Sequence, residues 1–350
     1  MGFGVGRWAR LVRGMLPSLV LGALFLYSVW PWLPFVHHER RVRTLVFYGF
    51  SILGDVMTQG VFPAFQEMWR ARTGEHIEFT FSFASSGTIT NQVIMGVPAD
   101  VCLVALEPDA TRMATAGLTP PEGWKRLPHR GAVNRSPFVI LVRPGNPKGI
   151  HDFEDLARSG VEVVHPDPLT SGGAKWSILA EYGAAARRHP QDPAAAGYQL
   201  LLGIWRNVVA QAASARAART QFQNGFGDAL VTYEQDGLLD RSRGKLEAEI
   251  IYPHSTILSE HTLVILERNV RPNERALVQA FSDFLWSETA QRLFVQYGFR
   301  SVDEKINAAH PALPPIADPF GIEDLGGWDY AWGAIIDEVW KKQVLKELER

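Results

Sequence analysis

The chain has 350 residues, of which 46% are hydrophobic, so it is long enough to bury a sizeable core and too long for one small domain. Its formal net charge of -2 and the lack of a long basic run outside the N-terminal region argue against a nucleic-acid partner. Cys102 is the single cysteine, which excludes an internal disulfide and a cysteine-based metal cluster.

The N-terminal region predicts a membrane segment. Arginines in residues 7–13 precede residues 14–38, which contain no Asp, Glu, Lys or Arg. The apolar part is long enough to span a bilayer of about 30 Å as a helix, with tryptophans near its far end. No small-residue cleavage site follows Leu26, so we favour an uncleaved anchor through residues 14–36 over a cleaved secretory signal. Either alternative exports the body of the protein.

From Thr44 onward, strand patterns alternate with helix patterns, which is typical of an α/β protein with mainly parallel sheets. In chain order, we expect strands near residues 44–50, 77–83, 101–105, 137–142, 161–165, 228–233 and 263–266. We expect helices around residues 62–73, 88–95, 108–116, 176–182, 220–224 and 276–285, and a last helix from residue 329.

Residues 168–176, with the sequence Pro-Leu-Thr-Ser-Gly-Gly-Ala-Lys-Trp, carry the strongest functional signal. The small residues Ser171, Gly172 and Gly173 run directly into an amphipathic helix. A ligand can therefore approach the free backbone NH groups of the first turn, where the helix dipole favours negative charge. Taken alone, the same pattern also fits an ordinary serine-capped helix.

Two further turns have the same character. Residues 85–88 (Ser-Ser-Gly-Thr) follow a predicted strand, and residues 213–218 (Ala-Ser-Ala-Arg-Ala-Ala) follow the apolar residues 208–210. Each turn opens a predicted helix. None of the three turns contains a carboxylate. Together they predict three helix N-termini that converge on one anion.

Several short motifs, each different, also follow one another along the chain. They are Ser86-Gly87, Lys125-Arg-Leu-Pro128, Leu141-Val-Arg-Pro-Gly-Asn-Pro-Lys148, Ile150-His-Asp152, residues 168–176, Ala215-Arg216 with Phe222, Gly227-Asp-Ala-Leu-Val231 with Glu234, Ser255-Thr-Ile-Leu258 and Gly326-Gly-Trp328. In this order, from about residue 45 to residue 328, they resemble the bacterial periplasmic sulfate-binding proteins that serve ABC importers.

The resemblance implies a type II periplasmic-binding-protein fold, with two α/β lobes joined by hinge strands. It divides the chain into an anchor and linker (1–43), one lobe in two parts (44–135 and 248–310), a second lobe (136–247) and a C-terminal segment that wraps back onto a lobe (311–350). The implied ligand is sulfate or thiosulfate, and the implied partners are the permease subunits of an ABC transporter. The implied location is the periplasm, and the anchor predicted from the N-terminal region would tether the protein to the inner membrane.

In this family, uncharged donors hold the anion. Carried over by position, the donors are the backbone NH groups of Gly49, Ser86, Gly172, Gly173 and Ala215, the Ser171 hydroxyl, and the side chain of Tyr233. A dianion only accepts hydrogen bonds, so a pocket of NH and OH groups without a carboxylate favours sulfate over a protonated phosphate.

The chain departs from the family pattern at two positions. Gly49 stands where the family usually has an acidic residue followed by proline, although glycine still supplies a backbone NH. Tyr233 stands where the family has a tryptophan, and a phenol can accept as well as donate a hydrogen bond. Phosphate and molybdate therefore stay open as ligands. Arg216, in the first turn of its helix, is expected either to support the site from behind or to be solvated.

Two other classes of function stay open. Ser86 or Ser171 is a conceivable nucleophile, but the chain has no Gly-x-Ser-x-Gly elbow, no phosphate-binding loop of the Gly-x-x-x-x-Gly-Lys type and no His-Glu-x-x-His motif. We therefore expect no enzyme activity, cofactor or metal. A membrane-tethered sensor that binds an oxyanion and signals through a neighbouring protein is the second alternative.

Overall fold

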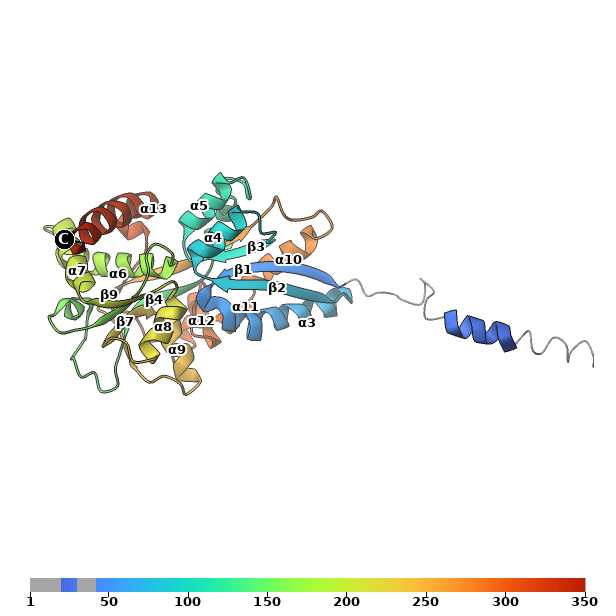
Figure 1. Ribbon diagram of the computed structural model, residues 1–350, viewed down its shortest axis with the longest axis horizontal. Coiled ribbons are helices and arrows are strands. Elements are labelled where there is room, and N and C mark those ends of the chain that lie inside the picture. Colours follow the sequence, from blue (N-terminus) through green and yellow to red (C-terminus); the bar gives the residue numbers. More distant parts are fainter. Residues whose placement is uncertain (1–19, 30–41, 350) are drawn as a thin grey trace, which may run out of the picture.

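The computed structural model describes residues 20–29 and 42–349 (Figure 1). Residues 20–29 form a helix. No helix in these described ranges combines the length and apolarity that crossing a membrane requires. Most of the anchor predicted at residues 14–36 lies outside the described residues, as do residues 37–41 of the linker.

Strands and helices alternate along the body. The strands are β1 (Arg43–Phe50), β2 (Ile77–Ala84), β3 (Val101–Val104), β4 (Ala132–Val142), β5 (Val163–Pro166), β6 (Val208–Ala212), β7 (Ala229–Tyr233), β8 (Glu249–Ile251), β9 (Ser255–Ile265), β10 (Arg300–Ser301) and β11 (Asp318–Phe320). The main helices are α3 (Phe62–Thr73), α4 (Ser86–Ile94), α5 (Glu107–Thr115), α6 (Gly172–Arg188), α7 (Pro193–Arg206), α8 (Ala215–Gln223), α9 (Glu234–Ser242), α10 (Arg275–Leu285) and α11 (Glu288–Gln296).

Shorter helical turns complete the chain. They are η2 (Ser51–Leu53), α2 (Gly54–Val56) and η3 (Met57–Val61), which lead without interruption into α3, then η4 (Gly123–Arg126), η5 (Pro128–Gly131), η6 (Phe153–Ala157), α12 (Glu304–Ala308) and η7 (Glu323–Leu325). The C-terminal helix consists of α13 (Gly327–Tyr330), η8 (Ala331–Val344) and α14 (Leu345–Leu348).

The sheet is mixed, with the strand order β2-β1-β3-β9-β4-β7-β5-β6. Strand β1 runs parallel to β2 and β3, and β5 runs parallel to β6 and β7. Strands β4 and β9 run antiparallel to each other, and they pair antiparallel with β7 and β3. The predicted parallel pairing is found within each half, and the antiparallel pairs come from the two long strands β4 and β9, of which the sequence indicated only a part.

Strands β4 and β9 link the two halves of the molecule. The start of β4 pairs with β10 and its end pairs with β7 and β8, while the end of β9 pairs with β3. We call the part built on β1, β2 and β3 the β1 half, and the part built on β5, β6 and β7 the β7 half. Figure 1 shows them as two adjacent bodies, with α3, α4, α5 and α10 on the β1 half and α6, α7, α8 and α9 on the β7 half.

The core explains why these segments form the strands. Every residue from Phe138 to Val142 in β4 is buried, as expected for a strand covered on both faces. In the β1 half, α3 buries Phe62, Phe65 and Trp69 on one face and ends at Gly74 with φ 74°. The ring of Phe62 stacks on Phe79 with centroids 4.0 Å apart, which fixes α3 on β2.

The C-terminal segment packs on the β7 half. Strand β11 pairs with β9, and the C-terminal helix contacts α6 and α7. The ring of Trp328 lies 4.8 Å from that of Trp176, and the ring of Trp340 lies 5.2 Å from that of Trp205. These contacts account for the apolar stripe in the last part of the sequence.

Candidate anion-binding site

Three helices begin with a serine cap at the junction of the two halves. Ser85 accepts from Thr88 N at 3.3 Å, Ser171 from Ala174 N at 3.3 Å, and Ser214 from Ala217 N at 3.2 Å. Each cap satisfies the third NH group of α4, α6 or α8. The helix itself offers no acceptor for the NH groups that precede it, so these point outward with the positive end of the helix dipole.

Two glycines bring these N-termini together. A Cβ built on Gly172 would lie 2.8 Å from Cβ of Ala105 and 3.1 Å from Cβ of Ser86. A Cβ built on Gly173 would lie 2.9 Å from Cε2 of Tyr233 and 3.3 Å from Cβ of Ala215. The start of α6 therefore contacts α4, α8 and the end of β7 at distances that only glycine allows. The structure thus brings together five predicted site residues and places Ser171 directly before Gly172, at the start of α6; the five are Ser86, Gly172, Gly173, Ala215 and Tyr233.

Tyr233 brings a polar group to this junction. Its side chain is 0% exposed, and its hydroxyl has no hydrogen-bond partner among the described residues. Burial raises the pKa of the Tyr233 phenol well above its ordinary value, and the charge of Asp236 adds to this rise. The hydroxyl is therefore neutral and able to donate. A buried hydroxyl without a partner is costly, unless a water molecule or a ligand supplies one.

Ser86 and Ser171, the two serines among the predicted donors, differ in the hydrogen bonds of their hydroxyls. The Ser86 hydroxyl donates to Asp109 Oδ2 at 2.6 Å and accepts from Ala105 N at 3.0 Å, which leaves its backbone NH as the group available to a ligand. The Ser171 side chain is buried and accepts from Ala174 N. Its own proton has no acceptor among the described residues.

Gly49 lies near the end of β1, level with Phe83 of β2 and Leu103 of β3. A Cβ built there would lie 2.8 Å from Cε1 of Phe47 and 3.0 Å from Cε1 of Phe83. These rings fill the space that a side chain at position 49 would need, where the family that the chain resembles usually has an acidic residue. The next residue, Phe50, places its ring 6.2 Å from that of Tyr233 and so forms an apolar wall beside the junction.

Arg216 does not direct its charge at the junction. Its Nη2 atom lies 2.7 Å from Asp55 Oδ2, and its Nε atom donates to the Ser51 carbonyl at 3.0 Å. This pairing supplies the partner that a cation in the first turn of a helix needs. A supporting role of Arg216 for the anion stays a prediction.

Sequence reasoning missed the contacts that join the halves around the site. Gly87 N donates to the Thr170 carbonyl at 3.2 Å, and Trp176 Nε1 donates to the Ala105 carbonyl at 2.7 Å. A Cβ on Gly87 would lie 2.8 Å from that Thr170 oxygen, so the glycine of this turn allows a direct backbone contact. The small-residue turns carried this signal, but without a structure their contact partners cannot be assigned.

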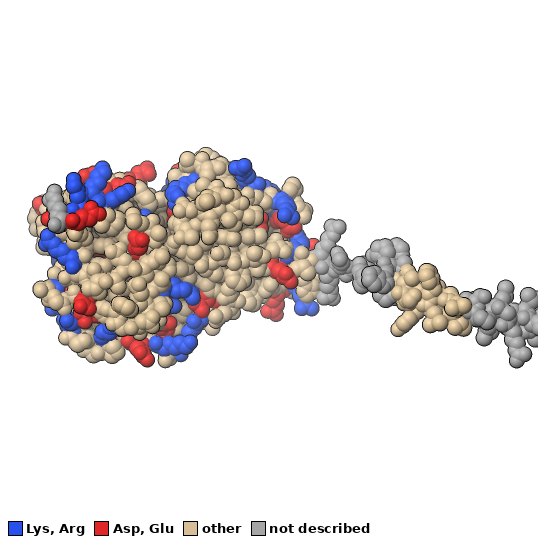
Figure 2. Space-filling view, in the orientation of Figure 1, with Lys and Arg blue, Asp and Glu red and all other residues tan. Residues whose placement is uncertain are grey.

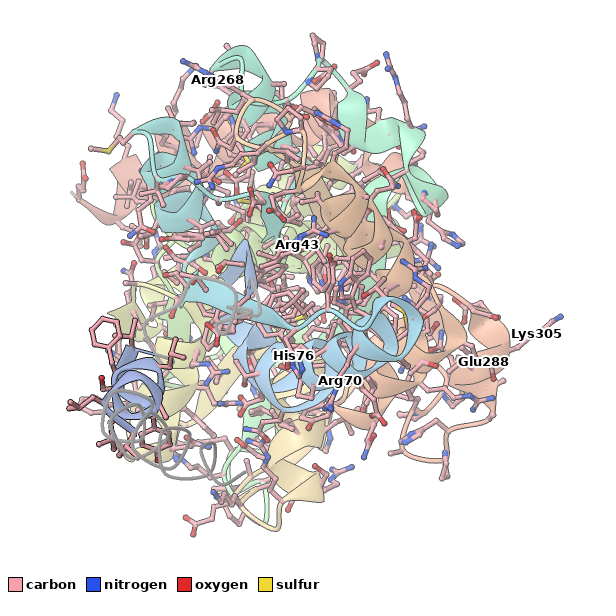
Figure 3. The ribbon with its side chains drawn as sticks, turned by 90° about the vertical axis from the view of Figure 1, so that its right-hand side faces the viewer. Arg43, Arg70, His76, Arg268, Glu288 and Lys305 are labelled. Carbon is pink, nitrogen blue, oxygen red and sulfur yellow. The ribbon has the colours of Figure 1, made fainter. Side chains whose placement is uncertain are left out.

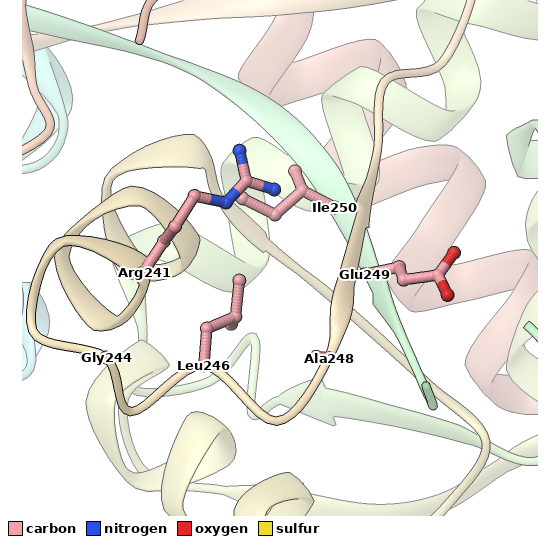
Figure 4. A pocket seen from close by; sticks show the side chains of 6 residues that line it. All are labelled: Arg241, Gly244, Leu246, Ala248, Glu249 and Ile250. Carbon is pink, nitrogen blue, oxygen red and sulfur yellow. The ribbon is translucent and has the colours of Figure 1, made fainter. Parts of the chain in front are cut away.

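A separate hollow of about 500 Å³ lies near the end of α9 and the start of β8 (Figure 4). Arg241, Leu246 and Glu249 are among its lining residues, and it contains none of the predicted donors. On the face shown in Figure 2, positive and negative side chains are interspersed over the body. That face shows no broad basic surface of the kind that nucleic acids require.

Comparison with known proteins places this geometry in a family. The family model described as bacterial extracellular solute-binding protein matches residues 56–300, which include every predicted donor except Gly49. A sulfate-binding protein of Synechococcus elongatus is 32% identical over 297 residues, which cover 81% of both chains. The chain belongs to the sulfate- and thiosulfate-binding protein family. Its members are bacterial extracellular solute-binding proteins.

Two further relatives agree with this assignment. A thiosulfate-binding protein of Pseudomonas aeruginosa is 31% identical over 289 residues, covering 79% of this chain and 86% of the relative. The structure of the sulfate-binding protein SubI from Mycobacterium tuberculosis superposes with a TM-score of 0.74 at 30% identity, covering 85% of this chain and 99% of SubI. The protein therefore has the mixed α/β fold of the periplasmic binding proteins.

Proposed function

We propose that this protein is the substrate-binding protein of an ABC importer and captures sulfate, or thiosulfate, between its two halves. The observation that carries the proposal is the convergence of the starts of α4, α6 and α8 beside the buried Tyr233 hydroxyl, which has no hydrogen-bond partner among the described residues. A tetrahedral dianion accepts from such donors and is stabilised by the three helix dipoles. The relatives that are named sulfate- and thiosulfate-binding proteins support this choice of anion.

We assign the donors as the sequence predicts them. They are the backbone NH groups of Gly49, Ser86, Gly172, Gly173 and Ala215, with the hydroxyls of Ser171 and Tyr233. The contacts of Gly172 and Gly173 support the assignment for α4, α6 and α8. The position of Gly49 inside β1 supports at most a backbone contribution from that strand.

The two halves act in this proposal as lobes of a type II fold. We assign residues 44–135 and 248–310 to one lobe, residues 136–247 to the other, and residues 311–350 to the wrapping segment, except that β8 pairs with the end of β4 and so belongs with the second lobe. Strands β4 and β9 serve as hinges. The Gly87–Thr170 and Trp176–Ala105 bonds then cross between the lobes, which corresponds to the closed conformation that traps a ligand.

The serines at the junction are arranged for binding and releasing a ligand, not for converting it. The Ser86 hydroxyl donates to the Asp109 carboxylate rather than to a histidine, so it is not set up as a nucleophile. We place the body outside the cytoplasm, as the family description supports, with residues 14–36 as its tether to the inner membrane. The permease subunits of the importer are the partner.

A second anion is compatible with one feature of the site. Tyr233 offers an oxygen that can accept a hydrogen bond, whereas the tryptophan of the resembling family can only donate. Hydrogen phosphate, which carries a proton, therefore stays the alternative ligand.

Equilibrium dialysis of the purified protein against radiolabelled sulfate tests the proposal. We expect one sulfate per chain, displaced by unlabelled thiosulfate. In Ser171→Trp the indole fills the junction, and we expect no retained label although the circular dichroism spectrum stays native. Retention that is unchanged in Ser171→Trp, or no retention by the unmodified protein, contradicts the proposal.

A further inference from the structure

The two strands β4 and β9 carry a buried row of polar side chains where they pair. Asn134 of β4 pairs with His261 of β9. Two residues further along, Ser136 pairs with Ser259, so all four side chains share one face of the sheet. Each of the four residues is 0% exposed. We call this row the hinge ladder. Strand pairing uses the backbone and does not require buried polar side chains, which are costly unless they bond to one another.

The hinge ladder holds both ring nitrogens of His261. Nδ1 lies 2.5 Å from Asn134 Oδ1, and Nε2 lies 3.3 Å from the Ser259 hydroxyl. That hydroxyl also donates to the Ser136 carbonyl at 2.7 Å. Because the amide oxygen of Asn134 only accepts, Nδ1 carries the ring proton. Burial lowers the pKa of His261 to about 3, so the ring is neutral and has this one proton. The imidazole cannot turn over without losing both contacts.

The ring of His261 also contacts the aromatic residues beside the proposed anion site. Its centroid lies 4.5 Å from that of Phe50 and 5.5 Å from that of Tyr233, with the Tyr233 ring at 70° to it. Phe50 belongs to the β1 half and Tyr233 to the β7 half. The histidine between the halves is therefore a support that both rings share.

The hinge ladder reaches Tyr233 by a second route. The Ser136 hydroxyl accepts from Gln235 N at 3.3 Å, and Gln235 lies two residues after Tyr233, in the first turn of α9. Phe138, which comes next on this face of β4, places its ring 4.6 Å from that of Tyr233. The Tyr233 hydroxyl itself bonds to no described residue, so its position depends on these contacts of the ring and the backbone.

We propose that His261 is a positioning residue for the anion site: held by the hinge ladder, it sets where the Tyr233 hydroxyl lies and how well that hydroxyl donates to the anion. This rests on the proposed function for its ligand, whereas the contact of His261 with Tyr233 is present without any ligand. The ring nitrogens of His261 are engaged by Asn134 and Ser259, so the histidine acts through the tyrosine. A hydrogen bond weakens steeply when its donor is displaced or misaligned, and a small shift of the Tyr233 ring therefore weakens binding.

A double-mutant cycle between His261 and Tyr233 measures this dependence. His261→Val, Tyr233→Phe and the double variant are compared by calorimetric titration with sulfate. We expect His261→Val to weaken sulfate binding about five-fold in the natural background and less than about two-fold when residue 233 is already Phe. Equal weakening in both backgrounds would show that His261 does not act through the tyrosine hydroxyl, and overturns the proposal.

A control separates positioning from general loss of stability, because His261→Val leaves Asn134 Oδ1 without its partner. Val264→Ala also removes buried atoms from β9, but Val264 belongs to a separate core cluster that includes Cys102. It should lower the melting temperature and leave the sulfate affinity unchanged. If the affinity falls in Val264→Ala as much as in His261→Val, binding follows stability and the positioning role is wrong.

A second measurement does not depend on the ligand. Tyrosine labelled with ¹³C at the ring carbon that bears the hydroxyl gives NMR signals for the eight tyrosines, and Tyr233→Phe identifies the signal of Tyr233. Ser259→Ala removes a contact of His261 and keeps the rings that touch Tyr233. In the empty protein, the Tyr233 signal should shift or split in Ser259→Ala. Glu288→Gln, at the outer edge of the molecule (Figure 3), should leave it unchanged.

The two measurements separate the positioning role from the ligand. An unchanged Tyr233 signal in Ser259→Ala overturns the positioning role, whichever anion binds. If the signal shifts but the natural protein binds no sulfate, the proposed ligand is wrong and the positioning role stands.

Discussion

At the scale of single residues, Tyr233 is a side chain that offers a neutral hydroxyl donor to the proposed anion site. Its ring packs on Phe138, with centroids 4.6 Å apart, and on Phe50, and its hydroxyl has no hydrogen-bond partner among the described residues. Removing that hydroxyl therefore costs the protein no internal hydrogen bond. Its effect should appear in ligand binding and leave stability unchanged.

The first prediction follows from this separation. Tyr233→Phe should weaken sulfate binding about ten-fold, as expected for the loss of one hydrogen bond to a charged acceptor. The melting temperature of the empty protein should stay within about 2 °C, because no protein partner is lost. Calorimetry measures both quantities. A fall in melting temperature with unchanged affinity would assign the tyrosine to packing.

A second prediction concerns the close approach of α6 to Tyr233. Gly173→Ala adds a Cβ 2.9 Å from a ring atom of the fully buried Tyr233, so the ring or the helix must shift. We expect the sulfate affinity to fall more than about 100-fold, since the start of α6 and the tyrosine must separate. Gly333→Ala, in the C-terminal helix with no atom within 4 Å of the added Cβ, is the matched control and should bind normally. Normal binding by Gly173→Ala would contradict the convergence of donors.

At the scale of elements, a charged contact adds to the packing that holds the C-terminal segment. Asp318 of β11 accepts from Arg187 of α6 at 2.9 Å and 2.6 Å, and from the Ser255 hydroxyl of β9. Hydrogen bonding to Arg187, then to Ser255, lowers the pKa of Asp318 to about 2. Because the folded pKa is below the unfolded one, this contact stabilises the fold above about pH 4 and is lost as the pH falls through 2.

The third prediction uses the pH range in which the Asp318 carboxylate becomes protonated. Asp318→Asn should lower the urea midpoint of the natural protein at pH 6, by an amount that corresponds to at most about 1 kcal/mol for a partly exposed pair. The difference between the two proteins should shrink steeply between pH 4 and pH 2. A difference that stays constant across this range would show that Asp318 stabilises the segment without its charge.

How far the elements can be predicted from the sequence depends on whether the signal is local. Helices α3, α5 and α10 have a clear apolar face and glycine or turn signals, and their positions agree with the prediction within a few residues. Strand β9 was recognised only near Leu263, because its first part alternates polar residues such as Ser259 and His261 that are buried by partners across the hinge. Such partners lie far away in the chain and leave no local pattern.

The same distinction applies to the site. The small-residue turns at Ser86, Ser171 and Ala215 are local, so the three helix N-termini could be predicted. The Asp55 contact of Arg216 and the contact of Gly87 with Thr170 join segments more than 80 residues apart, and no spacing in the sequence indicates them.

At the scale of the whole molecule, closure around an anion should be insensitive to pH near neutrality. The raised pKa of the Tyr233 phenol keeps it protonated. His261 lies behind it, with ring centroids 5.5 Å apart, and burial lowers the pKa of this histidine to about 3, so it stays neutral. Neither group changes charge between pH 6 and pH 8. Sulfate is also fully ionised throughout this range, whereas phosphate changes its protonation.

Calorimetric titration with sulfate at pH 6 and pH 8, beside phosphate and molybdate, is the most direct test of the account. We predict one sulfate site whose affinity changes less than about two-fold between the two pH values, and weaker binding of phosphate. Preference for phosphate, or no heat with any of the three anions, would contradict a sulfate receptor built from helix N-termini and neutral donors.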